Sequence, residues 1–483
     1  MTDLLELMKK IKYDKGGDKI YATLDYNGRK KKVSVTTKEY LNYVAKMFYE
    51  ETKEFIDDGA IKSRLRIIDC DLEYERNRNE LYAARYVHDD GKILIDMANE
   101  ELQYVEVSDG EYKIVDTMGD RAKFYTDTIR KPMEIIPLEE LEFSSFLEDL
   151  DELFNLPEDE LFLLKVWLVS CMNSQITSPM LYLLGGAGTG KSSMQRIIGD
   201  IVDPSIRGLI NWDGTSNNDL AIMLDHSYLI NFDNVSKITA IKSDLLCQAI
   251  TGGNSSVRMK YTDSDEVHFD LKARVTISSV DNCITHEDLA SRTLFINVPK
   301  MRNKVRIQES VLLEKYNNKR AQIMSEILVL LSFAKEEYSN WSKTHFSYHR
   351  LAGFEIFGSL VASILDEEHG YDRFMKIIKD KYIQQIFPDE SDRLFIYNFL
   401  ETLDEVFGGE YDGGTKYLYD NICNWIFDSS DCSYPMEEID MNYDRFTKML
   451  YQKSNLFSDL GVDMELKKNR TTNTSAIYIK RRN

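Results

Sequence analysis

Several features of extracellular, membrane and metal-binding proteins are missing from this 483-residue sequence. Its six cysteines include no Cys-x-x-Cys pair and no histidine at zinc-ligand spacing, so we expect reduced thiols and no structural metal. No apolar run is long enough to cross a bilayer, because the stretch at 161–172 contains Lys165 and the one at 327–334 is too short. The N-terminus shows no apolar signal segment. We therefore expect a cytoplasmic protein with no membrane contact.

The chain also has fewer basic than acidic side chains. The chain has 60 lysines and arginines against 81 aspartates and glutamates, which gives a formal net charge of −21. This balance excludes a histone-like protein that coats nucleic acid by bulk charge, but it leaves room for local basic surfaces. Hydrophobic residues make up 43% of the chain and aromatic residues 11%, which excludes disorder as the main state.

The order of apolar patterns divides the chain into five segments, without internal repeats or low-complexity tracts. They are a β-rich α+β domain at 1–137, an acidic helical connector or collar at 138–164, an α/β core at 165–300, a helical segment at 301–388, and a C-terminal domain at 389–483. The last segment shows three helical patterns followed by a hairpin, which predicts a winged helix.

The strongest motif is a glycine-rich loop that fits G-x-x-x-x-G-K-[ST] in full. The apolar run at 180–184 precedes it as a strand, and 193–201 follows it as a helix. Glycines let backbone N–H groups approach phosphates, and the helix N-terminus adds partial positive charge. Lys191 would reach the β- and γ-phosphates of ATP, and the Ser192 hydroxyl would bind Mg²⁺. The predicted ATP-binding residues are Gly185, Gly186, Ala187, Gly188, Thr189, Gly190, Lys191, Ser192 and Ser193.

A second apolar run, at 228–233, ends in Asp233. Because it would be a parallel strand, we expect Asp233 at the carboxyl edge of the sheet, where ligands bind, and on the Mg²⁺ side of the site. The next position, often acidic in nucleoside triphosphatases, is Asn234. Either Asn234 orients the attacking water, or the catalytic base comes from elsewhere.

Two further candidates follow along the chain. The strand at 273–279 ends in hydroxyl side chains, so Ser279 could contact the γ-phosphate or the water, with Ser278 and Asp281 as rivals; the alternative is a strand end with no role. Arg292 precedes another apolar strand and is placed to act as an arginine finger at a neighbouring subunit's site. The alternative for Arg292 is a surface salt bridge.

These four elements, in this order, resemble superfamily III helicases, a branch of the AAA+ ATPases. The segment at 250–263 resembles that family's extra motif, a β-hairpin that grips DNA in the ring channel, and Arg258, Lys260 and Tyr261 are its candidate DNA contacts. The sequence departs from the family at Asn234, where a second acid is expected, and at the serine end of the third strand, where asparagine is common.

The resemblance implies a homo-hexameric ring that hydrolyses ATP at subunit interfaces and threads single-stranded DNA with 3′-to-5′ polarity. The whole layout is similar to self-loading replicative helicases of phages and staphylococcal mobile islands. We therefore expect an ATP-dependent DNA helicase and replication initiator, with a separate primase as a further partner. Two alternatives stay open: an AAA+ loader or protein remodeller without unwinding activity, and a DNA-binding initiator whose ATPase is only a switch.

Basic side chains in the C-terminal segment indicate a second DNA contact, with origin duplex DNA. The candidates lie on the expected recognition helix and in the wing: Arg445, Lys448, Lys453, Lys467, Lys468 and Arg470. The alternative is a winged helix that binds protein.

One N-terminal pattern competes with the helicase interpretation. In the segment at 65–71, Asp69 and Asp71 alternate as they would at a strand end, which is how archaeal-eukaryotic-type primases hold catalytic metals. An exposed strand end without that role is the alternative, because no Ser-x-His partner follows.

Overall fold

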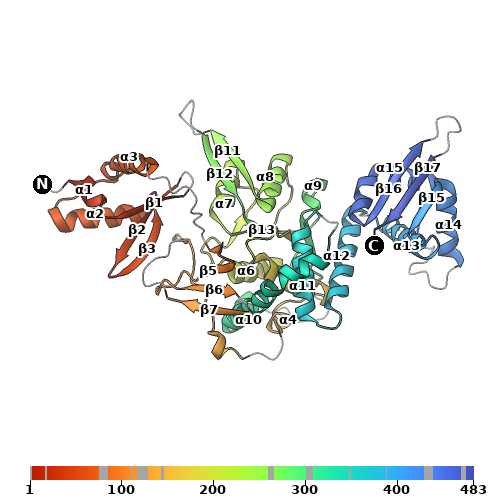
Figure 1. Ribbon diagram of the computed structural model, residues 1–483, viewed down its shortest axis with the longest axis horizontal. Coiled ribbons are helices and arrows are strands. Elements are labelled where there is room, and N and C mark those ends of the chain that lie inside the picture. Colours follow the sequence, from red (N-terminus) through yellow and green to blue (C-terminus); the bar gives the residue numbers. More distant parts are fainter. Residues whose placement is uncertain are drawn as a thin grey trace. The chain divides into compact units, whose positions relative to one another are not determined.

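The computed structural model describes residues 3–16, 19–74, 85–108, 110–116, 124, 129–142, 146–258, 266–300, 308–347, 350–387, 389–428, 439–468 and 475–482. The chain divides into two compact units. The first comprises 1–341 with 360–367, and the second comprises 342–359 with 368–483. Figure 1 shows the chain coloured from the N-terminus to the C-terminus, with many of its helices and strands labelled.

The first unit begins with a small lobe of three antiparallel strands and three helices, in the sheet order β1-β2-β3. Its elements are α1 (Leu4–Met8), β1 (Lys12–Gly16), β2 (Lys19–Tyr26), β3 (Arg29–Ser34), α2 (Lys38–Thr52) and α3 (Asp58–Tyr74). Asn27 and Gly28 both have positive φ, at 57° and 88°, which is the backbone that a tight two-residue hairpin between β2 and β3 requires.

The strand prediction for residues 65–71 is wrong, because this segment lies inside α3. Ile61, Leu65, Ile68 and Leu72 recur at helical spacing and pack into the core of the lobe. Side chains two positions apart on a helix do not share a face, so Asp69 and Asp71 do not form the paired site of a primase. They bind separate lysines, Lys15 at 2.8 Å and Lys9 at 3.3 Å.

A second antiparallel sheet follows in the order β4-β5-β6-β7. Its strands are β4 (Tyr86–Asp89), β5 (Lys92–Asp96), β6 (Tyr104–Ser108) and β7 (Glu111–Val115). In the described part of the acidic stretch after it, the helical elements before α5 begins are a 3₁₀ turn, η1 (Leu138–Glu140), and a short helix, α4 (Asp149–Leu153). The described part of the expected connector is therefore not one continuous helix.

The core of the first unit is a parallel five-stranded sheet in the order β14-β8-β13-β10-β9. Its strands are β8 (Met180–Leu184), β9 (Leu209–Asn211), β10 (Leu229–Asp233), β13 (Arg274–Ser279) and β14 (Thr293–Asn297). The helices of this region are α5 (Glu158–Cys171), α6 (Lys191–Val202), α7 (Asn217–His226), α8 (Ala240–Thr251) and α9 (Glu287–Ala290). The three central strands, β8, β13 and β10, are almost wholly buried. β8 is a continuous apolar run, whereas β13 also buries Arg274, Thr276, Ser278 and Ser279. This α/β arrangement is compatible with a P-loop core.

An antiparallel hairpin, β11 (Gly253–Arg258) and β12 (Glu266–Leu271), is inserted between α8 and β13. Three helices follow the sheet: α10 (Glu309–Thr344), α11 (Ala352–Leu365) and α12 (Gly370–Ile386). The described part of 301–388 is thus helical, as its sequence pattern predicts.

The second unit includes α12 and contains, after it, a three-stranded sheet in the order β15-β17-β16 and three further helices. The elements after α12 are α13 (Glu390–Glu405), β15 (Glu410–Gly414), α14 (Thr415–Asp428), α15 (Tyr443–Asp459), β16 (Val462–Lys468) and β17 (Ser475–Arg481). The three helices and the hairpin match the sequence pattern, but β15 is an addition. Phe395, Phe399, Phe446 and Phe457 pack together at the centre of this unit.

Among the described residues, no helix is both long and apolar enough to cross a bilayer.

Candidate nucleotide-binding site

The glycine-rich loop joins β8 to α6 at the carboxyl edge of the parallel sheet. Gly188 and Gly190 have φ of 73° and 91°, a left-handed backbone that other residues adopt only with strain. Gly190 is also the residue that precedes the first turn of α6. The loop therefore ends at a helix N-terminus, which is the arrangement that binds phosphate.

Gly185 is required by close packing against backbone, whereas Gly186 packs against the flexible stem of a lysine. A Cβ on Gly185 would lie 2.3 Å from the carbonyl oxygen of Val298, and a Cβ on Gly186 would lie 3.0 Å from Cε of Lys300. Val298 N also donates to Leu184 O at 2.7 Å, so the segment after β14 is fixed beside the loop. Larger residues at 185 would push the loop away from the sheet.

Lys191 is held against the loop. Its residue is only 8% exposed, and its Nζ donates to the carbonyl oxygens of Gly185 at 2.6 Å and Gly186 at 2.9 Å. Burial lowers the pKa of the Lys191 ammonium, and the nearby Asp233 carboxylate opposes that shift. An anion at the loop would give this buried cation a second counter-charge.

Asp233 accepts hydrogen bonds from serine hydroxyls on two different elements. Ser192 Oγ at the start of α6 donates to Asp233 Oδ1 at 3.1 Å, and Ser278 Oγ near the end of β13 donates to the same oxygen at 2.5 Å. Hydroxyl and carboxylate oxygens are the ligands that Mg²⁺ prefers. The side chains of Ser192 and Asp233 therefore fit a Mg²⁺ ion bound together with a phosphate.

The third-strand candidates differ in their contacts. Ser278 Oγ accepts from Asn234 N at 3.1 Å while it donates to Asp233. The Ser279 hydroxyl instead donates to Asp281 O at 2.5 Å, and its carbonyl accepts from Gly185 N at 3.3 Å. The side chain of Ser278 thus contacts Asp233, whereas the backbone of Ser279 contacts Gly185 at the start of the glycine loop.

Asn234 has a left-handed backbone, with φ of 53°. Left-handed backbone in a non-glycine residue is uncommon and recurs at functional sites. Its N–H donates to Ser278, and the next N–H, of Val235, donates to Ser278 O at 2.8 Å. The turn after β10 is therefore fixed to β13, although a role for the Asn234 side chain stays a prediction.

A buried polar network supports this edge, and sequence reasoning missed it. Gln195 Nε2 donates to Phe232 O at 3.0 Å and to Thr276 Oγ1 at 2.7 Å, and Thr276 donates to Asn231 Oδ1 at 2.7 Å. These contacts tie α6 to β10 and β13. Polar residues within apolar strands, such as Asn231 and Thr276, are the signal that could have found it.

Arg292 is 8% exposed and bonded within its own chain. Its Nη1 lies 2.6 Å from Asp288 Oδ2 and donates to Asp288 O at 2.8 Å. Its Nε is buried and has no hydrogen-bond partner among the described residues. The guanidinium is thus positioned by Asp288, and its buried Nε is unpaired within the described part of the chain.

The three predicted DNA contacts of the β11–β12 hairpin lie mostly outside the described residues. Arg258 ends β11, opposite Glu266 in the register, and its side chain lies outside the description. Lys260 and Tyr261 also lie outside the described residues.

Some of the predicted DNA-binding residues of the second unit contact other residues of that unit. Arg445 pairs with Asp392 at 2.9 Å and Asp389 at 3.4 Å. Lys453 lies at a kink in α15, donates to a backbone carbonyl and lies 4.8 Å from the ring centroid of Phe387. Lys448 is exposed on the same helix. In β16, the side chains of Lys467 and Lys468 lie outside the description, as does Arg470 entirely.

A cavity of about 400 Å³ lies at the other end of α6, where Asp200 and Asp203 line it together with the first residues of β10. No residue of the glycine loop lines this cavity. It is therefore separate from the candidate phosphate site.

The sequence model of one protein family, described as an actinomycete integrative conjugative element replication protein, matches residues 148–343. The match contains the whole parallel sheet and the glycine loop but less than half of the chain. No curated protein matches the sequence.

Two solved structures are similar over most of their length. An active helicase, SCCmec type IV Cch, is 11% identical, with 97% of this chain and 93% of that chain covered and a TM-score of 0.39. The apo C-terminal region of NrS-1 is 14% identical, with 98% of each chain covered and a TM-score of 0.37. At these TM-scores neither structure establishes a fold or an activity for this chain. The family match favours a replication protein.

Proposed function

We propose that this chain is an ATP-dependent DNA helicase that initiates replication, assembles as a homo-hexameric ring and translocates on single-stranded DNA. The observation that carries the proposal is the meeting of Lys191, Ser192 and Asp233 at the carboxyl edge of a parallel sheet. The match of 148–343 to a replication protein family supports the same direction.

The triphosphate of ATP would lie along residues 185–192, where backbone N–H groups and the α6 N-terminus face it. Lys191 would exchange its bonds to Gly185 O and Gly186 O for phosphate oxygens. Ser192 and Asp233 would hold Mg²⁺, which supplies charge neutralisation for phosphoryl transfer. Ser278 would keep the Asp233 carboxylate in place through its hydroxyl.

The water-activating group is one of a small set. Asn234 follows the metal-side acid directly, and its turn is fixed by Ser278. Ser279 is the second candidate, because it ends the neighbouring strand. We propose that Asn234 orients the water, since its left-handed backbone marks a constrained position at the site.

Arg292 would complete the site of the adjacent subunit. Its guanidinium is already positioned by Asp288 and retains an unused buried donor. Desolvated arginines of this kind neutralise charge that develops on the transferred phosphate.

Two surfaces would contact DNA. The β11–β12 hairpin would grip a single strand through Arg258, Lys260 and Tyr261. The C-terminal unit would bind origin duplex as a winged helix, which is supported by its element order of helix, strand, two helices and hairpin. Lys448 is the best-placed candidate on α15, because it is exposed and Arg445 is ion-paired.

The proposal is tested by ATPase activity measured with and without single-stranded DNA. Wild-type protein should be stimulated by DNA, and the Arg258→Ala, Lys260→Ala double variant should retain basal hydrolysis but lose the stimulation. If the double variant is stimulated and unwinds DNA like wild type, Arg258 and Lys260 are not the DNA contacts of the helicase. If wild-type protein hydrolyses ATP but is neither stimulated by single-stranded DNA nor able to unwind it, the chain acts as a loader or remodeller and not as the proposed helicase.

A further inference from the structure

A second lysine lies against the phosphate loop, although it is far from the loop in sequence. Strand β14 pairs in parallel with β8, with Asn297 opposite Leu184. The segments that follow the two strands therefore begin side by side at the same edge of the sheet. The segment after β14 contains Lys300, and the segment after β8 is the glycine loop.

The contact between them is close. The notional Cβ of Gly186 lies 3.0 Å from Cε of Lys300 and 3.9 Å from its Nζ. The lysine stem is therefore packed on bare loop backbone, while the residue as a whole is exposed. Because Gly186 has no side chain, the ammonium of Lys300 can lie at the loop surface.

Positive charges outnumber negative charges beside the glycine loop. Lys191 Nζ already donates to the carbonyl groups of Gly185 and Gly186, and Lys300 also lies against Gly186, so both lysines border this residue. Asp233 is the carboxylate that interacts with Lys191, and two hydroxyl groups already donate to one of its oxygens. Among the described residues, Lys300 has no ion pair or hydrogen bond. Two neighbouring cations with one nearby anion favour a ligand that carries several negative charges.

We propose that Lys300 is a second phosphate-contacting lysine, which reaches the phosphate chain of the nucleotide from the segment that follows β14. This inference rests on the proposed function of the loop as a nucleoside triphosphate site. Lys300 would be a phosphate-binding residue outside the glycine-loop motif. Nucleotide affinity would then depend on the segment that leads from β14 into α10.

The test is calorimetric titration of the full chain with ATP and with ADP, in the presence of Mg²⁺. Lys300→Ala should weaken ATP binding about tenfold, as expected for one charge-assisted contact, and should weaken ADP binding less. Lys300→Arg keeps the charge and should stay within about threefold of wild type. Lys315→Ala, which removes an exposed lysine from α10, is the matched control and should bind like wild type.

Equal ATP affinity in wild type and Lys300→Ala, with binding lost in Lys191→Ala, would overturn the role of Lys300 and leave the proposed function intact. An equal loss in Lys300→Ala and Lys300→Arg would also overturn it, because the loss would then follow from packing and not from charge. If wild type itself binds no ATP, the proposed function fails and the Lys300 contact fails with it.

Discussion

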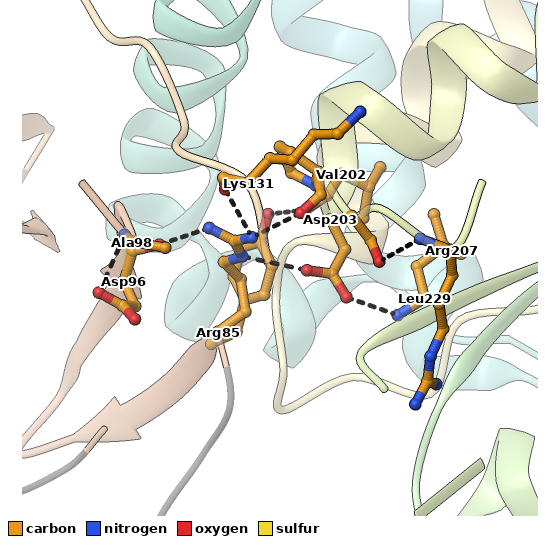
Figure 2. A network of polar contacts seen from close by, with 11 residues as sticks. Arg85, Asp96, Ala98, Lys131, Val202, Asp203, Arg207 and Leu229 are labelled. Carbon is orange, nitrogen blue, oxygen red and sulfur yellow. Dashed lines mark hydrogen bonds and ion pairs between the residues drawn. The ribbon is translucent and has the colours of Figure 1, made fainter. Parts of the chain in front are cut away.

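Arg85 Nε donates to Asp203 Oδ1 at 3.0 Å, and neither side chain is exposed beyond a few per cent. The remaining donors of Arg85 reach the backbone carbonyls of Asp96, Lys131 and Pro204 at 3.0 to 3.2 Å (Figure 2). Asp203 directly follows α6 and also accepts from Leu229 N at 3.3 Å. One guanidinium therefore connects the β4–β7 sheet to the helix that begins at the phosphate loop.

We expect Arg85→Met to destabilise the first unit by about 3 to 5 kcal/mol, because it leaves the buried carboxylate of Asp203 without its partner. Arg85→Lys should recover only part of this loss, since one ammonium cannot reproduce four directed bonds. The measurement is urea unfolding followed by circular dichroism. Arg66→Met, at an exposed position of α3, is the control. A loss no larger than that of the control would show that the contact contributes little.

The contacts of Ser278 and Ser279 lead to a paired prediction. Ser278→Ala removes the hydroxyl that orients Asp233, so the Mg²⁺ concentration needed for half-maximal ATP hydrolysis should rise about ten- to a hundredfold. Ser279→Ala removes a hydroxyl that bonds to Asp281 O, and should leave the Mg²⁺ dependence near that of wild type. The opposite ranking would make Ser279 the residue that acts at the phosphate.

Arg292→Ala should lower the rate of ATP hydrolysis by about a thousandfold while nucleotide binding is kept. Because the arginine would act on a neighbouring subunit, mixing this variant with Lys191→Ala protein should restore part of the activity. Asp288→Asn, which removes the ion pair at 2.6 Å but keeps the arginine, should have an intermediate rate. Absence of any recovery in the mixture would argue against a shared site.

Glu326 predicts a pH dependence of stability. Burial raises the pKa of its carboxyl, although hydrogen bonds from Gln322 and from Leu147 N oppose the shift. Because the folded pKa lies above the unfolded one, the stability gained from this group is complete below the unfolded pKa and is lost as the pH rises through the folded pKa.

Glu326→Gln cannot ionise and keeps an oxygen for Leu147 N, so it should be more stable than wild type at neutral pH. The difference should shrink as the pH falls toward about 4, near the pKa of an unperturbed glutamate. Denaturation midpoints across this pH range measure it, with exposed Glu337→Gln as the control. A difference that does not change with pH would contradict the assignment.

The sequence predicts the strand before the glycine loop well, because it appears as an unbroken apolar run beside a motif of fixed spacing. The run covers Met180–Leu184, and the structure has β8 at the same bounds. Strand β15 could not be found this way: its residues Glu410–Gly414 have no apolar alternation, and it exists because it pairs with β17.

Site contacts were harder to predict than strands. Both Ser278 and Ser279 are buried, so the period of the strand does not tell which one faces Asp233. Lys300 carries no motif, and only the parallel pairing of β14 with β8 brings it to the loop. Such contacts depend on strand order, which a single sequence does not specify.

The most direct test of the central claim is strand displacement on forked DNA with a single-stranded tail of one polarity at a time. The account predicts that wild-type protein displaces the strand with ATP and Mg²⁺, starts from a 3′ tail, and stops completely in Lys191→Ala. Hydrolysis of ATP by wild type without displacement from either tail would contradict it.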